Sequence, residues 1–274
     1  MSTPQHTQLE FVHAFGVGRN IRESVAFHTD VGVVYPVGRH VTMQNTVTRA
    51  MHTLPQTPGL HKLLAIQIWY GVRVGYVTRV VFATVFDGGP FLDSPKQRYI
   101  AVCERVKPEH SEVPTSQISV FDLRTAPVFR KMRTLTNPVR AAPGQKPSDI
   151  FGCAFSGDSK FLACQTGRPD WTVMIWHWFQ SRVICSVEVP ARVSRVTFNP
   201  VDSSQISTSG PSHFRLWRVM DEGLRPFPPF AGVKGTEHIV DHDWFVGCVL
   251  DALLLTSRAT SPSLAFRSLG SCLT

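Results

Sequence analysis

One stretch of this chain, Ala154-Phe-Ser-Gly-Asp-Ser-Lys-Phe-Leu-Ala-Cys164, is followed by Met174-Ile-Trp-His-Trp178. A second copy reads Phe198-Asn-Pro-Val-Asp-Ser-Ser-Gln-Ile-Ser-Thr-Ser-Gly210 and continues as Phe214-Arg-Leu-Trp-Arg-Val219. Each copy has an apolar strand, a turn of Ser or Asn, Gly or Pro and Asp, a second apolar strand, a loop, and a strand that carries Trp. The repeated order predicts short β-strands joined by tight turns.

The spacing of the two copies indicates the kind of repeat. Phe155 and Phe198 are 43 positions apart, and Trp176 and Trp217 are 41 positions apart. Self-similarity at about 40–45 residues is the period of a β-propeller blade of the WD-repeat kind. The expected fold class is therefore all-β, a WD-repeat β-propeller, and such a repeat favours a scaffold over a catalyst.

An earlier and weaker copy precedes these two. Ser94-Pro-Lys-Gln-Arg-Tyr-Ile-Ala-Val102 aligns without a gap on Ser156–Cys164. Ile118–Asp122 then takes the place of the strand that carries Trp, and Arg130–Leu135 follows as a fourth strand. These matches predict another four-stranded blade, because a propeller blade is a sheet of four strands.

The outer parts of the chain extend the array in more degenerate form. Val31–Pro36 and His40–Asn45 have the texture of strands, and His238–Trp244 opens a further blade. We expect about four to five degenerate blades, at roughly 20–60, 61–136, 148–190, 191–230 and 237–270. The pattern leaves open whether they close into a ring or form an incomplete or truncated propeller.

The expected organisation has three parts. Residues 1–19 form an N-terminal segment in which Phe11–Phe15 is a candidate closing strand, and residues 20–247 hold the blades. Residues 248–274 are a divergent end that is a candidate contributor to the last blade. Two interruptions, Trp69–Asp93 and Thr136–Ser148, are expected to project as loops, which is where such scaffolds carry function.

Composition favours a non-secreted protein. Apolar residues make up 43% of 274 residues, and no stretch approaches the roughly 18–20 apolar residues of a membrane helix. The start, Met1–Glu10, lacks the order of a secretory signal, so a cytoplasmic chain is expected. The six cysteines contain no CxxC pair, so we interpret them as small buried hydrophobes rather than zinc or redox ligands.

The formal net charge of +8 favours acidic partners, whether nucleic acid, an anionic membrane or an acidic protein surface such as tubulin tails. The charge is dispersed, and its densest cluster, Arg130-Lys131-Met132-Arg133, is too short for a nucleic-acid tract. We interpret Arg130, Lys131 and Arg133 as a solvated strand edge and as candidate protein contacts. Neither specific nucleic acid nor membrane is predicted as a partner.

The best enzyme-like constellation is Glu237-His-Ile-Val-Asp-His-Asp243, where His238 and His242 are spaced closely enough to bind a transition metal. The alternative is structural, because WD-type blades place a His before the inner strand, hydrogen-bonded within the same blade. No GxSxG or GxxxxGK[ST] motif is present. The structural interpretation is favoured, so we predict no catalytic residue, no cofactor, no metal site and no enzyme activity.

The tryptophans can be interpreted in two ways. Trp176, Trp178 and Trp217 fall at blade-strand positions and are expected to fill space between blades; the other expected structural blade residues are Asp158, Asp202 and His242. Base stacking beside Arg215 and Arg218 is the alternative. In the loop Arg168-Pro-Asp-Trp171, we select Arg168, Asp170 and Trp171 as candidate protein contacts, although Trp171 could instead fold back onto its blade.

Several phrases in a fixed order resemble one family. Ala154–Leu162, Gln165–Trp171, Ile175–Trp178 and Val196–Asp202 are similar to the WD-repeat region of the family of cilia- and flagella-associated protein 57, a WD-repeat protein of the motile axoneme. The resemblance extends over about 10–245, through Val31–His40, Leu224–Phe230 and Asp241–Trp244. Family members carry tandem propellers followed by long coiled coils, whereas a single propeller pattern is recognisable here.

The resemblance implies a non-catalytic scaffold of the ciliary or flagellar axoneme and cytoskeleton that acts in assembly or regulation of inner dynein arms. The implied partners are axonemal proteins, including inner-arm dynein components and tubulin, together with other propeller repeats in cis or in trans. The alternative from a different class is a propeller adaptor in a translation or other RNA-associated complex. Binding to RNA that weakens steeply with rising salt would distinguish it.

Overall fold

The computed structural model describes residues 25–28, 31–68, 98–107, 113–138, 148–169, 171–211, 213–221, 223–227, 238–246, 250–258 and 261–268. Within these ranges the chain forms five antiparallel sheets, each built from consecutive strands. The candidate closing strand Phe11–Phe15, the interruption Trp69–Asp93 and residues 139–147 of the second interruption lie outside the described residues.

We name the five sheets blades 1 to 5 in chain order. Blade 1 contains β1 (Ala26–Phe27), β2 (Gly32–Val37), β3 (His40–Asn45) and β4 (Met51–Thr53), and blade 2 contains β5 (Leu60–Ile68), β6 (Tyr99–Val106), β7 (Thr115–Asp122) and β8 (Arg130–Thr136). Blade 3 contains β9 (Ile150–Phe155), β10 (Phe161–Thr166), β11 (Thr172–His177) and β12 (Arg182–Glu188), and blade 4 contains β13 (Arg195–Phe198), β14 (Gln205–Gly210), β15 (His213–Met220) and β16 (Gly223–Phe227). Blade 5 contains β17 (His238–Val246), β18 (Leu250–Arg258) and β19 (Ser261–Ser268).

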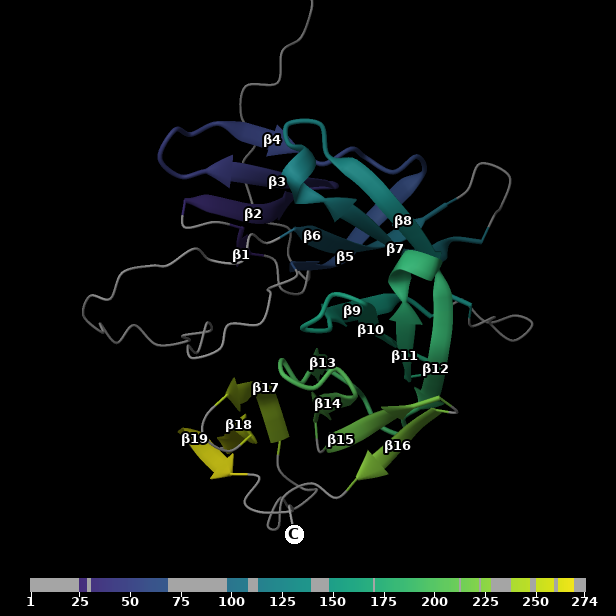
Figure 1. Cartoon of the computed structure of the whole chain (residues 1–274), viewed down its shortest axis with the longest axis vertical. Helices are drawn as coiled ribbons and strands as arrows, with labels where there is room; N and C mark the ends of the chain where they lie inside the picture. Colours follow the sequence, from purple (N-terminus) through teal and green to yellow (C-terminus); the bar gives the residue numbers. More distant parts are fainter. Residues whose placement is uncertain are drawn as a thin grey trace, which may run out of the picture.

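These sheets confirm the expected all-β, propeller-like fold with four to five blades. The blades follow one another along an arc, from β1–β4 (purple) through the teal and green blades to β17–β19 (yellow) (Figure 1). The first strands face the middle of this arc, because β9 contacts both β5 and β13, and β17 contacts β13 and β14. Each blade therefore radiates outward from its first strand.

Burial follows from this radial stacking. In blade 3, the middle strands β10 and β11 are covered on both faces by blades 2 and 4, and Leu162, Cys164 and Met174 are fully buried. The outermost strand of blade 2, β8, leaves Arg130 and Arg133 exposed. Strands buried on both faces read as continuous apolar runs, which is why Phe161–Cys164 lacks the alternation of a half-buried strand.

Apolar side chains from neighbouring blades form the cores between them, with one cluster between blades 1 and 2, one between blades 2 and 3 and one between blades 3 and 4. An ion pair also joins blades 2 and 3. Nε of Arg105, in β6, donates to Oδ1 of Asp149 at 2.7 Å, just before β9, and a second guanidinium nitrogen contacts the other carboxylate oxygen. A bidentate pair of this kind holds two sheets in one relative orientation.

The helical pieces among the described residues are two short 3-10 turns, η1 (Leu123–Thr125) and η2 (Trp178–Gln180). No helix in the described part of the chain has the length and apolar character needed to cross a membrane. The prediction that Trp178 lies on a blade strand is wrong, because Trp178 begins η2, after β11 has ended. Its ring is nevertheless fully buried, 4.9 Å from the Tyr99 ring of blade 2 between centroids.

Candidate protein-contact surfaces

The repeated Trp occupies one equivalent position in successive blades, and its partner changes from blade to blade. In blade 4, Nε1 of Trp217 donates to Oγ1 of Thr208 at 2.8 Å, and the same hydroxyl lies 2.9 Å from Nε2 of His213. Burial lowers the pKa of His213 to about 4, so its neutral ring can accept a hydrogen bond from the Thr208 hydroxyl. Trp217, Thr208 and His213 therefore form one hydrogen-bonded chain across β14 and β15.

In blades 3 and 2, other residues stand at the positions of Thr208 and Trp217, and the hydrogen-bonded chain is lost. Cys164 takes the position of Thr208 in blade 3, and Nε1 of Trp176 is buried without an ordinary hydrogen-bond partner. Burial raises the pKa of the Cys164 thiol to about 12, and a contact with Trp176 opposes that rise. In blade 2 the equivalent pair is Phe121 and Val102, so the position is wholly apolar there.

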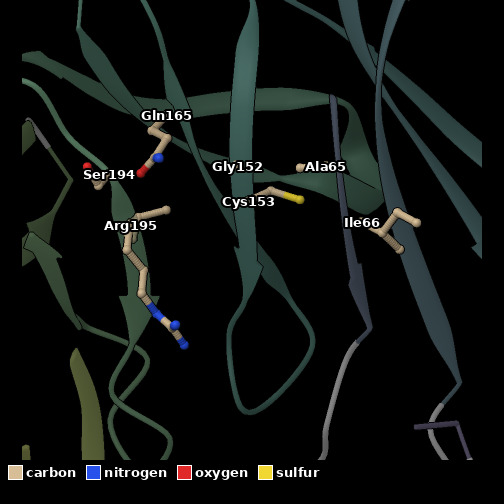
Figure 2. A pocket seen from close by; sticks show the side chains of 8 residues that line it. Ala65, Ile66, Gly152, Cys153, Gln165, Ser194 and Arg195 are labelled. Carbon is tan, nitrogen blue, oxygen red and sulfur yellow. The ribbon is translucent and has the colours of Figure 1, made fainter. Parts of the chain in front are cut away.

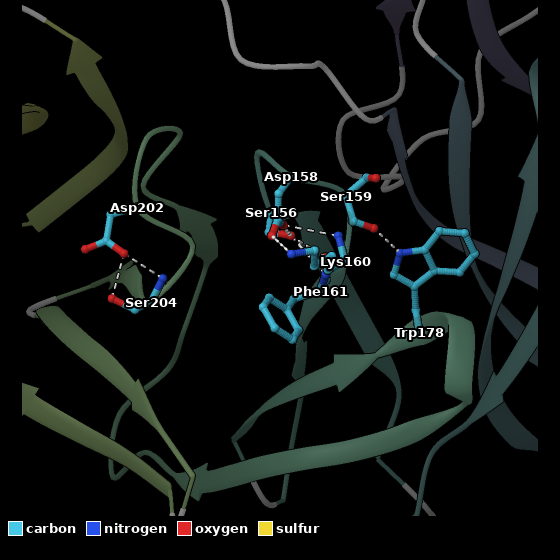
Figure 3. Close-up of polar contacts among 8 residues, drawn as sticks. All are labelled: Ser156, Asp158, Ser159, Lys160, Phe161, Trp178, Asp202 and Ser204. Atoms are coloured by element: carbon cyan, nitrogen blue, oxygen red, sulfur yellow. Dashed lines mark hydrogen bonds and ion pairs between the residues drawn. The ribbon is translucent and has the colours of Figure 1, made fainter.

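Two aspartates organise the turns between the first and second strands of blades 3 and 4 (Figure 3). Oδ1 of Asp158 accepts from the Ser156 hydroxyl at 2.7 Å, and Oδ1 of Asp202 accepts from the backbone N–H and the hydroxyl of Ser204 at 2.9 and 2.6 Å. Burial opposes ionisation of both carboxyl groups, but these hydrogen bonds outweigh it and lower both pKa values. The two aspartates thus hold tight turns, which is their structural role.

The two blades also meet through these turns. A Ser203 side-chain hydrogen bond helps to lower the pKa of Asp158, so the turn of blade 4 reaches the turn of blade 3. On the other side, Nε1 of Trp178 donates to the backbone oxygen of Ser159 at 2.6 Å (Figure 3). This bond gives the indole N–H of the buried Trp178 ring a partner.

The expected role of His242 needs correction. The ring was expected to hydrogen-bond within its own blade, but its described partners all belong to blade 4. Nδ1 lies 2.6 Å from the Ser209 hydroxyl, and Nε2 lies 2.7 Å from the Ser207 hydroxyl and 3.1 Å from the Thr197 hydroxyl. Burial lowers the pKa of His242 to about 3, so the ring is neutral. Its position in β17 makes it a joint between blades 4 and 5.

No group of three or more His, Cys, Asp or Glu side chains in the described residues is arranged to hold a metal ion. The side chain of His238, the other half of the candidate metal pair, lies outside the described residues. A small pocket lies where the first strands of blades 2, 3 and 4 converge, with Gln165 and Ser194 on one side and Ala65 and Ile66 on the other (Figure 2). Its volume of about 20 Å³ has room for one water and not for an organic substrate.

The structure separates the two sets of candidate contact residues. Arg168 is exposed and Trp171 is half-buried in the loop between β10 and β11, and Asp170 lies outside the described residues. Arg130 begins β8, after the turn between the third and fourth strands of its blade. Because successive antiparallel strands reverse direction, these two connections leave opposite ends of the blades. The two sets therefore do not form one surface.

Lys131 differs from the expectation of a solvated contact residue. It is half-buried, and its Nζ donates to Oγ1 of Thr57 at 2.7 Å while lying 5.3 Å from the centre of the Phe121 ring. Burial lowers its pKa, and the charge of Glu104 opposes that shift. Glu104 itself is buried, and its carboxylate accepts hydrogen bonds from Thr57, Gln117 and Ser119. Lys131 is thus part of an internal polar cluster of blade 2.

The sequence interpretation missed three residues that lie near the contact between blades 2 and 3. Arg98 and Arg124 flank Asp122, and Phe179 contacts Arg133 through its backbone oxygen. The sequence carries a signal for them, because arginines outnumber carboxylates in Asp122–Arg133. Arg98 is distant in sequence and could not have been added without the strand pairing.

Most of this chain is similar in sequence to known cilia- and flagella-associated proteins. Cilia- and flagella-associated protein 57 of Mus musculus is 23% identical over 217 residues, which cover 78% of this chain and 14% of that protein. The chain is homologous to cilia- and flagella-associated protein 57. Cilia- and flagella-associated protein 57 C of Tetrahymena thermophila is 21% identical over 221 residues, which cover 79% of this chain and 14% of that protein. The resemblance stated from the sequence phrases is therefore confirmed.

A shorter match points to a related protein. Cilia- and flagella-associated protein 44 of Mus musculus is 33% identical over 66 residues, which cover 24% of this chain and 4% of that protein. No family model matches the chain. The chain spans about 14% of the length of the two relatives named cilia- and flagella-associated protein 57, so the activity and partners of those whole proteins come to this chain only as proposals.

Proposed function

We propose that this chain is a non-catalytic, propeller-like scaffold of the motile ciliary or flagellar axoneme. The observation that carries the proposal is its similarity to cilia- and flagella-associated protein 57 over 78% of the chain. The blades support it physically, because a repeat array presents exposed edges and loops on a rigid core. The blade region assigned to residues 20–247, with the end at 248–274, is part of the same proposal.

The finer part of the proposal is that the scaffold acts in assembly or regulation of inner dynein arms. Its partners would be axonemal proteins, namely inner-arm dynein components and tubulin, with other propeller repeats in cis or in trans as a further class. Exposed basic side chains on blade edges, such as Arg130 and Arg168, suit acidic protein surfaces. The net charge of +8 has the sign that attracts such surfaces.

The net charge also favours the second candidate, an adaptor in a translation or other RNA-associated complex. The tryptophans argue against it, because a base-stacking platform must expose its ring. Trp176 and Trp217 are 4% and 2% exposed. Arg215 lies 5.7 Å over the Trp217 ring and Arg218 lies 5.8 Å over the Phe227 ring, so both arginines pack on aromatic rings of their own blade. The axonemal scaffold is therefore preferred.

The test is the location of the tagged chain in a ciliated or flagellated cell, before and after detergent extraction. We expect the signal to stay on the extracted axoneme, and proximity labelling to mark inner-arm dynein components. The tag alone is the matched control for trapping in the extracted material. Complete loss of the signal with the soluble cytoplasm would contradict the scaffold role and would bring the RNA-complex adaptor forward.

A further inference from the structure

Four arginines of blade 2 lie near its contact with blade 3: Arg98 just before β6, Arg124 in η1, and Arg130 and Arg133 in β8. We call them, together with Phe179, the arginine edge. We propose that the arginine edge binds an acidic peptide segment, meaning a run of chain rich in Glu or Asp. This inference rests on the proposed scaffold function and gives it a surface and a partner chemistry.

In the first part of the surface, a single carboxylate, that of Asp122, holds two of the four arginines in place. Oδ2 of Asp122 accepts from Nε of Arg98 at 3.0 Å, and Oδ1 lies 3.6 Å from Nε of Arg124. The Asp122 side chain is only 7% exposed, whereas those of Arg98 and Arg124 are 35% and 51% exposed. Asp122 therefore fixes two guanidinium groups side by side and leaves both of them open to solvent.

The second part comes from the contact between the two blades. Nε of Arg133, in β8 of blade 2, donates to the backbone oxygen of Phe179 in η2 of blade 3 at 2.8 Å. The ring of Phe179 lies 6.1 Å from the ring of Tyr99 between centroids. The guanidinium of Arg98 lies 4.7 Å from the centre of the same Tyr99 ring. These contacts join Arg98, which precedes β6, and Arg133, in β8, into one surface.

The charges of this surface are not balanced within the described residues. Asp122 is the one acidic residue in the segment Asp122–Arg133, which carries three arginines and Lys131. No carboxylate among the described residues forms an ion pair with Arg130 or Arg133, and both side chains are exposed. An excess of exposed guanidinium groups attracts an anionic partner, and guanidinium binds carboxylates in a bidentate geometry.

The aromatic side chain of the surface favours a peptide over a nucleic acid. Phe179 is 36% exposed, but its ring stacks on Trp178 with 4.1 Å between centroids and an interplanar angle of 33°. Arg133 lies over the same ring at 6.0 Å. A base needs an open aromatic face on which to stack, and Trp178 and Arg133 already lie against this ring. Val128, which is 77% exposed in the turn before β8, adds apolar contact area suited to a peptide.

The experiment measures binding of the full chain to a short fluorescein-labelled peptide of glutamate and glycine by fluorescence anisotropy. The test variant is Arg124→Glu with Arg130→Glu, and the matched control is Arg192→Glu with Arg225→Glu. Both pairs lower the formal net charge from +8 to +4. All four side chains are exposed, and the control residues belong to blade 4 and the connection that leads to it, Arg225 in β16 and Arg192 between β12 and β13. A glutamine peptide of the same length reports binding that does not depend on charge.

We expect the test variant to bind the glutamate peptide about tenfold more weakly or worse, and the control to stay within about twofold of the parent chain. Affinity of the parent should fall as salt rises, because the contacts are exposed charges. Circular dichroism and thermal unfolding establish that each variant is folded. If charge reversal unfolds the chain, Arg124→Gln with Arg130→Gln replaces it, with an expected weakening in the same direction.

The proposal is overturned if the parent does not bind the glutamate peptide, or if both variants weaken binding equally, since net charge alone would then explain it. It is also overturned if a uridine oligonucleotide or a phosphatidylserine vesicle binds more tightly through the same arginines. The axonemal test is separate: retention on the axoneme without peptide binding removes only the arginine edge. Peptide binding without retention removes only the axonemal scaffold.

Discussion

His242 in the first strand of blade 5 shares a hydrogen bond with Ser209 in the second strand of blade 4, with 2.6 Å between Nδ1 and the hydroxyl oxygen. Both side chains are almost fully buried, at 2% and 0% exposed. The described contacts between these blades therefore include buried polar groups, together with the Phe214 ring 5.5 Å from the His242 ring between centroids. A buried polar joint is stable only while each of its groups keeps a partner.

We expect His242→Ala to lower the free energy of unfolding by about 1–3 kcal/mol, because it leaves the buried hydroxyls of Ser207 and Ser209 with fewer partners. Chemical denaturation followed by tryptophan fluorescence measures the change. His61→Ala is the control, since His61 is exposed in β5. Equal effects of the two substitutions would show that His242 does not join the blades.

Stability should depend on pH through the two buried histidines. Burial lowers the pKa of His213 to about 4 and that of His242 to about 3, from an ordinary value of 6.5. Between these values the unfolded chain binds protons that the folded chain does not. The free energy of unfolding must then fall as pH falls below about 6.5, by up to about 1.4 kcal/mol per pH unit for each histidine.

Denaturation at a series of pH values between about 7 and about 5 measures this dependence, and it stays above the range in which Asp158 and Asp202 titrate. His213→Asn and His242→Asn, made separately, should each reduce the slope. A flat stability profile for the parent chain in this range would mean that neither ring is buried in its neutral form.

The hydrogen-bonded chain of blade 4 makes a further prediction. Thr208→Val should lower the free energy of unfolding by about 1–3 kcal/mol, because Nε1 of Trp217 and Nε2 of His213 both lose the hydroxyl while they stay buried. Thr208→Ser keeps the hydroxyl and should cost less. Thermal unfolding of both variants tests the chain, and indistinguishable losses would assign the effect to packing alone.

Blade 3 permits the reverse substitution. Cys164→Thr places a hydroxyl where Trp176 lacks an ordinary partner, in the arrangement that Thr208 and Trp217 adopt in blade 4. We expect Cys164→Thr to be at least about 0.5 kcal/mol more stable than Cys164→Val, which has nearly the same volume and no hydroxyl. If the valine variant is equally stable, no hydrogen bond forms at this position.

The repeat pattern predicted most strands, because strand formation depends on alternation and turn chemistry that are local in sequence. Tyr99 aligned on Phe161 without a gap, and the structure places both at the start of a second strand. Trp178 is an exception to this pattern. The sequence predicted a blade-strand position for Trp178, but β11 ends at His177 and a 3-10 turn carries Trp178.

By itself the sequence determined the all-β class, the period of the blades and the resemblance to ciliary proteins, since each of these is written in the order of residues along the chain. The tertiary structure alone decided which side chains from distant parts of the chain meet, within a blade and across blades. In the structure the described partners of His242 belong to blade 4, and Lys131 lies in an internal cluster with Glu104. Arg98 lies beside Asp122 and Arg124. The physical reason is that strand register within a blade and the stacking of neighbouring sheets set these contacts, and no local pattern in the sequence encodes either of them.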